Sequence, residues 1–265
     1  MELSEKEKRG QVSLVSVITP SFNSGRFITT CIEGVVKQCV PGMSVEHIII
    51  DNNSTDETNT IAKDAIDNMA GAYKITFISE PDAGHHEAIT KGIMLAKSPY
   101  IAVCNTSDYY AYERWLADAI YYIEKYKVDC IWGMNYNVDE DYENCYDADH
   151  VGAIRGVPFS YKPYGIKDYI IHSVGFSEVT AVFRRESIQS IMPMKRPQHP
   201  WLFIQYDFFT SGFTSMFIPV IAAVTRKHKD SLATQNGEGV ERKAFAEIAY
   251  LIDIYRRSHF ASLAD

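Results

Sequence analysis

Short polar or acidic residues follow four separate apolar stretches of this 265-residue chain. Asn23, Asp51, Asp82 and Asp108 each come soon after a run of strand-forming residues. Oxygen-bearing side chains of this kind suit a hard divalent cation or the polar edge of a ligand. An acidic residue after a strand is also a common helix cap, so a single one carries little weight. Four in succession indicate a ligand site.

The apolar stretches have the composition of parallel strands covered by helices. Three of them are rich in β-branched residues, and residues 100–103 form an unbroken apolar run, which is typical of a strand buried on both faces. Strand–loop–helix units repeated in this way predict right-handed crossovers and a mostly parallel sheet. Ligands of such sheets sit beyond the carboxyl ends of the strands, where the four polar residues converge. The expected strands are 13–19, 45–50, 73–79 and 100–103, and the expected helices are 27–37, 55–69 and 86–96.

The pattern loosens after residue 110. Residues 135–171 are rich in Tyr, Asp, Gly and Pro and lack clear periodicity, so we expect short strands and a functional loop there. The elements expected around this segment are helices over 113–126, 201–212 and 240–257 and strands over 128–134, 180–184 and 215–224.

Composition limits the partners of the protein. The chain is 46% hydrophobic and 23% charged, with a net charge of −8 and a pI of about 5.5. Such an acidic chain is a poor match for nucleic acid, which needs clustered Lys and Arg. A nucleotide needs only a local site and stays compatible with this charge.

The chain carries no sign of export. Its five cysteines form no CxxC pair, and no apolar run reaches the length of a membrane span. The charged start of the chain is followed by no signal-peptide core, so we expect a cytoplasmic protein. Basic residues flank the apolar stripe of the last helix and permit peripheral contact with the inner face of a membrane. These are Arg242, Lys243, Arg256 and Arg257.

Four motifs in order resemble the family 2 glycosyltransferases, inverting enzymes with a Rossmann-like GT-A fold. Val17-Ile-Thr-Pro-Ser-Phe-Asn23 resembles the family's opening strand and nucleotide loop. Ile49-Ile-Asp51-Asn-Asn-Ser-Thr-Asp56 is similar to its second signature, and Glu80-Pro-Asp82-Ala-Gly84 opens a stretch similar to its third. Cys104-Asn-Thr-Ser-Asp108 falls where the family has its metal-binding pair of acids.

The resemblance implies transfer of a sugar from a nucleotide sugar, a UDP-sugar above all, to an acceptor hydroxyl with inversion. The acceptor would be a glycan, a lipid-linked sugar or a small molecule, in polysaccharide or glycan biosynthesis. By this resemblance Asp51 meets the base, and Lys91 lies near the diphosphate. The implied donor-binding residues are Thr19, Pro20, Asn23, Asp51, Asn53, Asp82, Gly84, His85, Lys91, Asn105 and Ser107.

The resemblance also implies a Mn²⁺ or Mg²⁺ ion held by Asp108. Ser107 stands where the family usually has the first of two acids, and a hydroxyl is a weaker ligand than a carboxylate. His228 lies in Arg226-Lys-His-Lys-Asp-Ser231, which is similar to a downstream His-x-x-Ser element, and is the candidate second ligand. The alternative is that His228 is an ordinary loop histidine.

The catalytic base implied by the resemblance is Asp207. The family places an acidic pair at the start of a late helix, and here the first acid is replaced by Tyr206. A carboxylate among apolar residues suits a general base, because partial desolvation raises its pKa. Its alternative role is to anchor a backbone amide. Trp201 and Glu178 are the acceptor-side candidates, and Glu178 is the alternative base.

We therefore expect one α/β domain over residues 1–265. Residues 13–110 would bind the donor, and 111–265, with the C-terminal helix, would shape the acceptor side. Two other functions are compatible with parts of the sequence. A binding or regulatory protein on a decayed transferase fold would explain Ser107 and Tyr206. A sugar-1-phosphate nucleotidyltransferase would need a Gly-rich, basic loop after the first strand, which is missing.

Overall fold

The computed structural model describes residues 13–68, 73–140, 145–149, 162–172, 174–194, 200–229 and 237–259. Its centre is one sheet of nine strands. The strands are β1 (Ser13–Ser21), β2 (Met43–Asp51), β3 (Tyr73–Ser79), β4 (Tyr100–Val103), β5 (Tyr109–Tyr110), β6 (Cys130–Asp139), β7 (Cys145–Asp149), β8 (Val182–Arg184) and β9 (Ser215–Lys227).

The sheet has a parallel half and a mixed half. Its order is β3-β2-β1-β4-β8-β6-β9-β5, and β7 pairs with β6 at one side of this path. Strands β3, β2, β1 and β4 run parallel, whereas β8 is antiparallel to both of its neighbours. Strand β6 is parallel to β9. The α/β fold with a mostly parallel sheet is thus confirmed, and the four acidic loops all follow the parallel strands.

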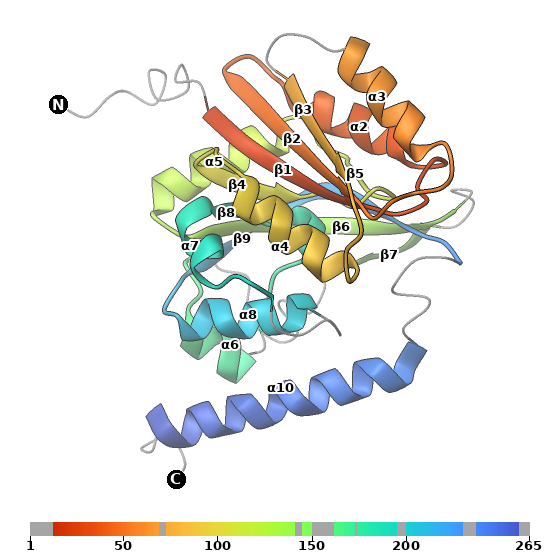
Figure 1. The fold of residues 1–265 in the computed structure, drawn as a ribbon. Coiled ribbons are helices and arrows are strands. Elements are labelled where there is room, and N and C mark those ends of the chain that lie inside the picture. The colour runs from red at the N-terminus through yellow and green to blue at the C-terminus, as the bar shows by residue number, and fades with distance from the viewer. Residues whose placement is uncertain are drawn as a thin grey trace, which may run out of the picture.

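Helices cover both faces of the sheet (Figure 1). One face packs against α2 and α5, and the other packs against α4, α6, α7 and α8. The helices are α2 (Ile28–Val36), α3 (Thr58–Asn68), α4 (His85–Leu95), α5 (Trp115–Tyr126), α6 (Ile166–His172), α7 (Arg185–Ser190), α8 (Pro200–Thr210) and α10 (Gly237–His259), with a short 3-10 turn, η1 (Glu178–Thr180).

Burial on both faces explains the apolar runs in the sequence. On β1, Val15 and Val17 enter the core under α2 and α5, whereas Ile18 enters the core under α4. Strand β4 lies between β1 and β8, and its Ile101, Ala102 and Val103 are all buried. Most positions of these central strands therefore favour an apolar residue, whichever face of the sheet they occupy.

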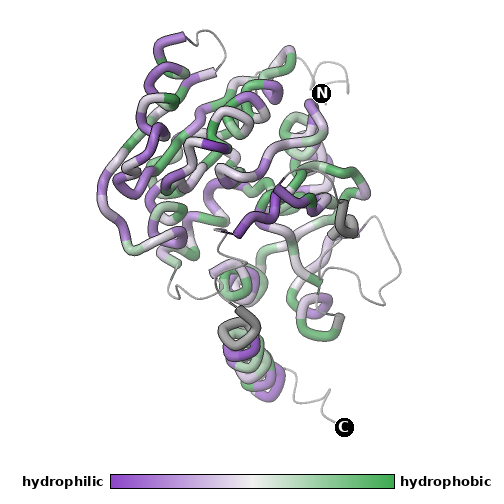
Figure 2. The backbone as a smooth tube through the Cα atoms, turned by 90° about the vertical axis from the view of Figure 1, so that its right-hand side faces the viewer, coloured by the Kyte–Doolittle hydropathy of each residue, from purple (hydrophilic) through white to green (hydrophobic). Residues whose placement is uncertain are grey.

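Helix α10 is a long, straight helix at the outside of the molecule (Figure 1), and Figure 2 shows it nearly end-on. Its Ala244 and Ile248 pack against Phe203 of α8. Polar and apolar residues alternate around the rest of it, and Phe245 and Tyr250 are exposed. Among the described helices, none combines the length and apolar character needed to cross a bilayer.

The structure differs from the sequence-based expectation mainly between β6 and β8. The described part of this segment contains α6, which the aperiodic stretch did not predict, and one short strand, β7. The remainder of that stretch, residues 141–144 and 150–161, lies outside the described residues, as do residues 1–12, which we expected to be polar and loose. Cys31, Cys39, Cys104 and Cys130 are free thiols.

Candidate active site

The parallel strands bring the predicted loops together at one edge of the sheet. Ser21 at the end of β1 is aligned with Asp51 of β2, and Asp51 is aligned with Ser79 of β3. The amide of Cys104, just after β4, donates to the Ile18 carbonyl of β1 over 3.0 Å. The four loops are therefore neighbours, as the convergence argument predicted.

Asn23 and Asp51 form hydrogen bonds that hold the loops after β1 and β2 in place. Asn23 has a left-handed backbone (φ 46°), its amide donates to Ser54 Oγ over 2.8 Å, and its side-chain oxygen accepts from the Thr55 amide over 2.9 Å. Asp51 is fully buried and accepts from the Ser54 amide over 2.9 Å and from Ser79 Oγ over 2.8 Å. Asn53, also left-handed (φ 49°), lies exposed beside Ser79. The side chains of Asn23 and Asp51 therefore fix the conformation of these loops through hydrogen bonds.

The Thr19-Pro20 turn is buried under these loops. Thr19 Oγ1 donates to the Cys104 carbonyl over 2.7 Å and lies 2.7 Å from His47 Nε2. Burial lowers the pKa of His47 to about 3, so its ring is neutral. The Thr19 side chain thus ties β1, β2 and β4 together, and the turn lies beneath the surface of the candidate site.

Phe22 is a candidate that the sequence argument did not select. It lies in the β1 loop, and 60% of its side chain is exposed. An exposed aromatic ring in the middle of a polar loop provides a face on which a base can stack. The signal was the aromatic position next to Asn23, which composition alone does not separate from packing.

Asp82 has one carboxylate oxygen that no hydrogen bond satisfies. Its Oδ1 accepts from the Gly84 amide over 2.8 Å, and its own amide donates to Asn52 Oδ1 over 2.9 Å. The Oδ2 atom is buried and accepts no hydrogen bond. Burial raises the pKa of Asp82, and the Glu87 and Asp51 carboxylates add to this shift. Gly84 (φ 113°) has open space around it, so this corner is accessible.

Asp108 is buried at the end of the β4 loop, with 2% of its surface exposed. It accepts hydrogen bonds from Asn105 Nδ2 over 3.0 Å, from Ser107 Oγ over 3.4 Å and from the Arg226 amide over 3.3 Å. Burial nevertheless raises its pKa to about 7, and the nearby Glu178 carboxylate contributes to this rise. A bound cation would offset the cost of ionising this buried carboxylate.

Basic residues at the end of β9 lie next to Asp108. The Arg226 guanidinium lies over the Phe27 ring at 5.0 Å, and the His228 ring lies 4.7 Å from the same ring. The structure therefore brings His228 to the Asp108 edge of the sheet. Asp230 and Ser231, the rest of the predicted His-x-x-Ser element, lie outside the described residues. Lys91 points to the preceding loop, where it forms an ion pair with Glu80.

His85 and Glu178 complete the cluster. His85 Nε2, at the start of α4, lies 3.0 Å from Asn105 Oδ1 and 3.3 Å from Glu178 Oε1. Glu178 comes from η1, far along the chain from the four loops. Two residues that the sequence placed on the donor side and the acceptor side are thus in contact.

Asp207 and Trp201 lie elsewhere on α8. The family pattern places the acids at the start of a helix, but α8 begins at Pro200, so Asp207 lies in its last turn. Asp207 interacts electrostatically with Tyr169 of α6. The Trp201 ring stacks on Phe183 in the core, with ring centroids 6.3 Å apart. Trp201 therefore packs in the core, and Asp207 lies near α6.

The metal-ligand atoms near Asp108 are of types that suit a divalent cation, although they are few. No group of three or more His, Cys, Asp or Glu side chains in the described part of the chain is arranged to hold a metal. The buried Asp108 carboxylate offers a hard oxygen, and His228 offers an imidazole at the same edge. This pair of ligand types suits Mn²⁺ better than Mg²⁺, which prefers oxygen alone.

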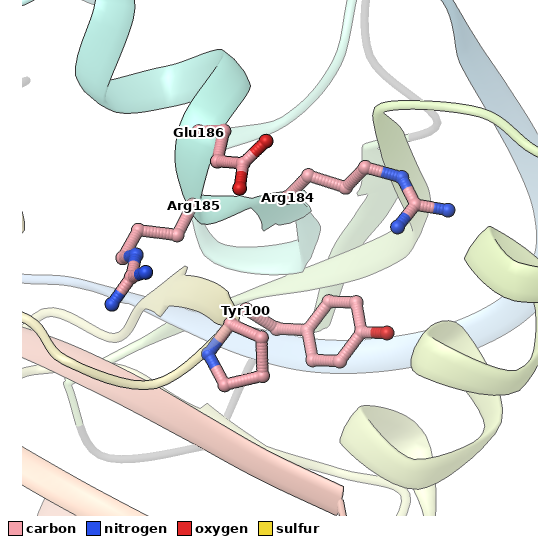
Figure 3. Close-up of a pocket in the computed structure, with 5 residues that line it drawn as sticks. Tyr100, Arg184, Arg185 and Glu186 are labelled. Atoms are coloured by element: carbon pink, nitrogen blue, oxygen red, sulfur yellow. The ribbon is translucent and has the colours of Figure 1, made fainter.

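A small pocket of about 130 Å³ lies at the opposite edge of the sheet, beside the first residue of β4 (Figure 3). Arg184, one of its lining residues, donates to Glu124 Oε1 over 2.6 Å and to the Val128 carbonyl over 3.0 Å. Tyr100 donates to the same Glu124 oxygen over 2.7 Å. These groups serve the packing of α5 on the sheet, and the pocket is separate from the acidic loops.

A GT-A fold with acidic loops at the ends of its parallel strands defines a class of nucleotide-dependent sugar transferases. The family model "Glycosyl transferase family 2" matches residues 16–192, and the chain belongs to this family. The chain is 29% identical to glycosyltransferase GlyG of Streptococcus pneumoniae over 133 residues, which are 50% of this chain and 42% of that protein. It is 26% identical to chondroitin synthase of Escherichia coli over 136 residues, 49% of this chain and 18% of that protein. The chain thus spans less than half of these relatives.

Solved structures share the fold at low sequence identity. The structure of S. aureus TarS matches with a TM-score of 0.66 at 15% identity, over 91% of this chain and 39% of that one. The complex of TarS residues 1–349 with UDP-GlcNAc matches with a TM-score of 0.64 at 17% identity, over 88% of this chain and 66% of that one. The mannosyltransferase PcManGT of Pyrobaculum calidifontis, bound to GDP-Man and Mn²⁺, matches with a TM-score of 0.60 at 14% identity, over 89% and 69%. The GT-A fold is therefore confirmed.

Proposed function

We propose that this protein transfers a sugar from a UDP-sugar to an acceptor hydroxyl, with inversion, in glycan biosynthesis. The observation that carries the proposal is the buried, unsatisfied Oδ2 atom of Asp82 at an open corner between two acidic loops. Such an atom costs free energy unless a ligand donates to it. The ring N–H of uracil is a suitable donor. TarS, with the same fold, binds UDP-GlcNAc.

In this proposal the base lies between Phe22 and Asp82. Phe22 offers an exposed ring face, Asp82 accepts the ring N–H, and the backbone of Thr19 and Pro20 closes the floor. Asp51 and Asn23 contribute indirectly, because their hydrogen bonds hold the loops that form this pocket. Base recognition thus moves from Asp51, which the resemblance implied, to Asp82.

An Asp82→Asn variant should lose uridine affinity by roughly 10-fold or more while its stability stays close to wild type. The side-chain oxygen must still accept from the Gly84 amide, so the new NH₂ group faces the base. It then opposes the N–H of uracil but can donate to the ring nitrogen of cytosine. Calorimetry with UDP and CDP should show the UDP preference falling.

The matched variant is Asp51→Asn. One carboxylate oxygen of Asp51 accepts from the Ser54 amide and the Ser79 hydroxyl, and the other accepts from the Ser54 hydroxyl. The amide can keep the first two hydrogen bonds, but it loses the negative charge that strengthens all three, and its NH₂ group replaces an acceptor of the Ser54 hydroxyl. We therefore expect a loss of about 1–3 kcal/mol in the free energy of unfolding. A reversed pattern, with UDP affinity lost only in Asp51→Asn, would return base recognition to Asp51.

Asp108 and His228 would hold the divalent cation, with Asn105 and Ser107 orienting the Asp108 carboxylate. When bound, the ion would neutralise the diphosphate that departs from the sugar. The Arg226 guanidinium, held over Phe27 at the same edge, adds positive charge to this region. Lys91, at present paired with Glu80, can join it if that surface ion pair opens.

We also propose that the two halves of the sheet bind different substrates. The parallel half, residues 13–110, binds the donor, and residues 111–265 shape the acceptor side with β6, β9 and α8. The contact of Glu178 with His85 joins the halves at the point where sugar and acceptor would meet.

A thermal-shift panel of UDP-, GDP- and dTDP-sugars, with and without Mn²⁺, tests the function. A true donor present at a hundredfold excess over its dissociation constant should stabilise the fold by about 2.7 kcal/mol. Release of UDP from the stabilising donor separates a transferase from a regulatory protein that only binds it. No stabilisation by any nucleotide sugar would contradict the proposal.

A further inference from the structure

Glu178 is a half-buried carboxylic acid side chain inside the candidate site. It lies on η1, which packs beside β4 and β6, and 18% of its side chain is exposed. Its Oε1 atom is buried and receives no well-formed hydrogen bond, although His85 Nε2 lies 3.3 Å away. A buried oxygen left without a donor is costly, and it is available to accept a proton.

A chain of close polar contacts links Glu178 to the proposed metal site. Asn105 donates through Nδ2 to Asp108 over 3.0 Å, which leaves its Oδ1 as an acceptor. His85 Nε2, 3.0 Å from that Oδ1, must therefore carry a hydrogen. The same N–H side of the ring faces Glu178. His85 thus holds its position through Asn105 and presents a donor to the Glu178 carboxylate.

We propose that Glu178, rather than Asp207, takes the proton from the acceptor hydroxyl, and that His85 is its positioning residue. This inference rests on the proposed transferase function. The acceptor oxygen forms a bond to the anomeric carbon, and the bond from that carbon to the diphosphate oxygen breaks. The electron pair of the broken bond leaves with UDP, and the hydroxyl proton passes to the Glu178 carboxylate.

The charges around His85 favour its protonated form. Burial alone would lower the pKa of His85, but the Glu178 carboxylate, the Asn105 hydrogen bond and the Asp108 carboxylate raise it above its ordinary value. The titratable groups that face Glu178 are His85 from α4, Asp108 from the β4 loop and Cys104 at the end of β4.

Asp207 lies in a different part of the fold. It is in the last turn of α8, within electrostatic range of Tyr169 on α6. Glu178, in contrast, lies 3.3 Å from His85, and His85 lies 3.0 Å from Asn105 of the β4 loop. A general base must reach the proton it removes, either directly or through one water. The contacts of Glu178 therefore agree better with this role.

The test compares Glu178→Gln and Asp207→Asn, both nearly isosteric, by UDP release from UDP-GlcNAc in Mn²⁺ and by calorimetry with UDP. We expect Glu178→Gln to lower kcat by 100-fold or more with UDP affinity within threefold of wild type. Asp207→Asn should stay within threefold in both measurements. Glu178→Asp, which keeps a shorter carboxylate, should recover part of the activity. His85→Gln should lower kcat and leave the UDP dissociation constant unchanged.

NMR titration of the His85 ring provides a readout that does not depend on turnover. Glu178→Gln should lower the pKa of His85, because the attracting carboxylate is gone, whereas Asp207→Asn should leave it in place. Loss of turnover in Asp207→Asn with retention in Glu178→Gln would overturn the inference, and so would a His85 titration insensitive to Glu178. A wild-type protein that binds no UDP would instead contradict the proposed function.

Discussion

Replacing Asp108 with asparagine should abolish Mn²⁺-dependent binding of UDP and at the same time stabilise the ligand-free protein above neutral pH. Asp108 is the one carboxylate that the β4 loop contributes to the proposed metal site, and an amide is a much weaker ligand. The gain in stability follows from its burial. A pKa displaced from 3.8 to about 7 corresponds to about 4 kcal/mol of penalty on the charged form.

The sign of the pH dependence follows from the two pKa values. In the unfolded chain the Asp108 carboxyl loses its proton near pH 3.8, whereas in the folded protein it keeps the proton up to about pH 7. Between these values the folded state binds more protons, so stability falls as pH rises. Above pH 7 both states are ionised and the full penalty is present. Asp108→Asn should remove this contribution.

The measurement is urea unfolding from pH 4 to pH 8 for wild type, Asp108→Asn and Asp67→Asn. Asp67 is an exposed residue of α3 and serves as the matched control. The Asp108→Asn minus wild-type difference should grow in favour of the variant by about 4 kcal/mol over this pH range. Mismatched hydrogen bonds to Asn105 and Arg226 should lower the stability of the variant by about 1–3 kcal/mol at every pH, which leaves a net gain above neutral pH. Calorimetry should show that Ser107→Asp tightens Mn²⁺ binding. Equal metal-assisted UDP affinity in wild type and Asp108→Asn would remove Asp108 from the metal site.

The parallel half of the fold was predictable because its residues repeat one physical pattern. Each strand is buried on both faces, as Val17 and Ile18 show by entering opposite cores, and a helix with one apolar side follows each of the first three. Residues 135–171 carry no such pattern, and α6 was missed there. Seven residues with a mixed composition give too short a window for helical periodicity to appear.

The location of the site could be predicted from the sequence, but the roles of its individual residues could be predicted less well. Parallel strands bring the loops of Asn23, Asp51, Asp82 and Asp108 to one edge, and the repeated strand–loop–helix units predicted these parallel strands. The sequence does not show that the carboxylate of Asp51 is used up by Ser54 and Ser79, while Asp82 keeps a free oxygen. Such differences depend on side-chain directions in loops, and the approach of Glu178 to His85 depends on a contact between distant segments.

Gly92 sets the distance between α4 and the sheet, and its replacement should be among the most destabilising single changes. A Cβ atom at this position would lie 2.2 Å from Cγ2 of Ile18, a fully buried residue of β1. That methyl group is fixed to a β-branched carbon and cannot swing away freely. Gly92→Ala should therefore lower the free energy of unfolding by about 1–3 kcal/mol, even though alanine favours a helix.

The same change should reach the donor site, because α4 begins at His85 and follows Gly84. If the helix must move away from β1, both residues shift relative to Asp82 and Asn105, and UDP affinity should fall with stability. Ile18→Ala removes the clashing methyl group, so the double variant should recover part of the loss, with a coupling energy of about 0.5–3 kcal/mol in a double-mutant cycle. Gly165→Ala is the control, since no atom lies within 4 Å of its Cβ position. Additive effects of Gly92→Ala and Ile18→Ala would show that this contact does not set the position of the helix.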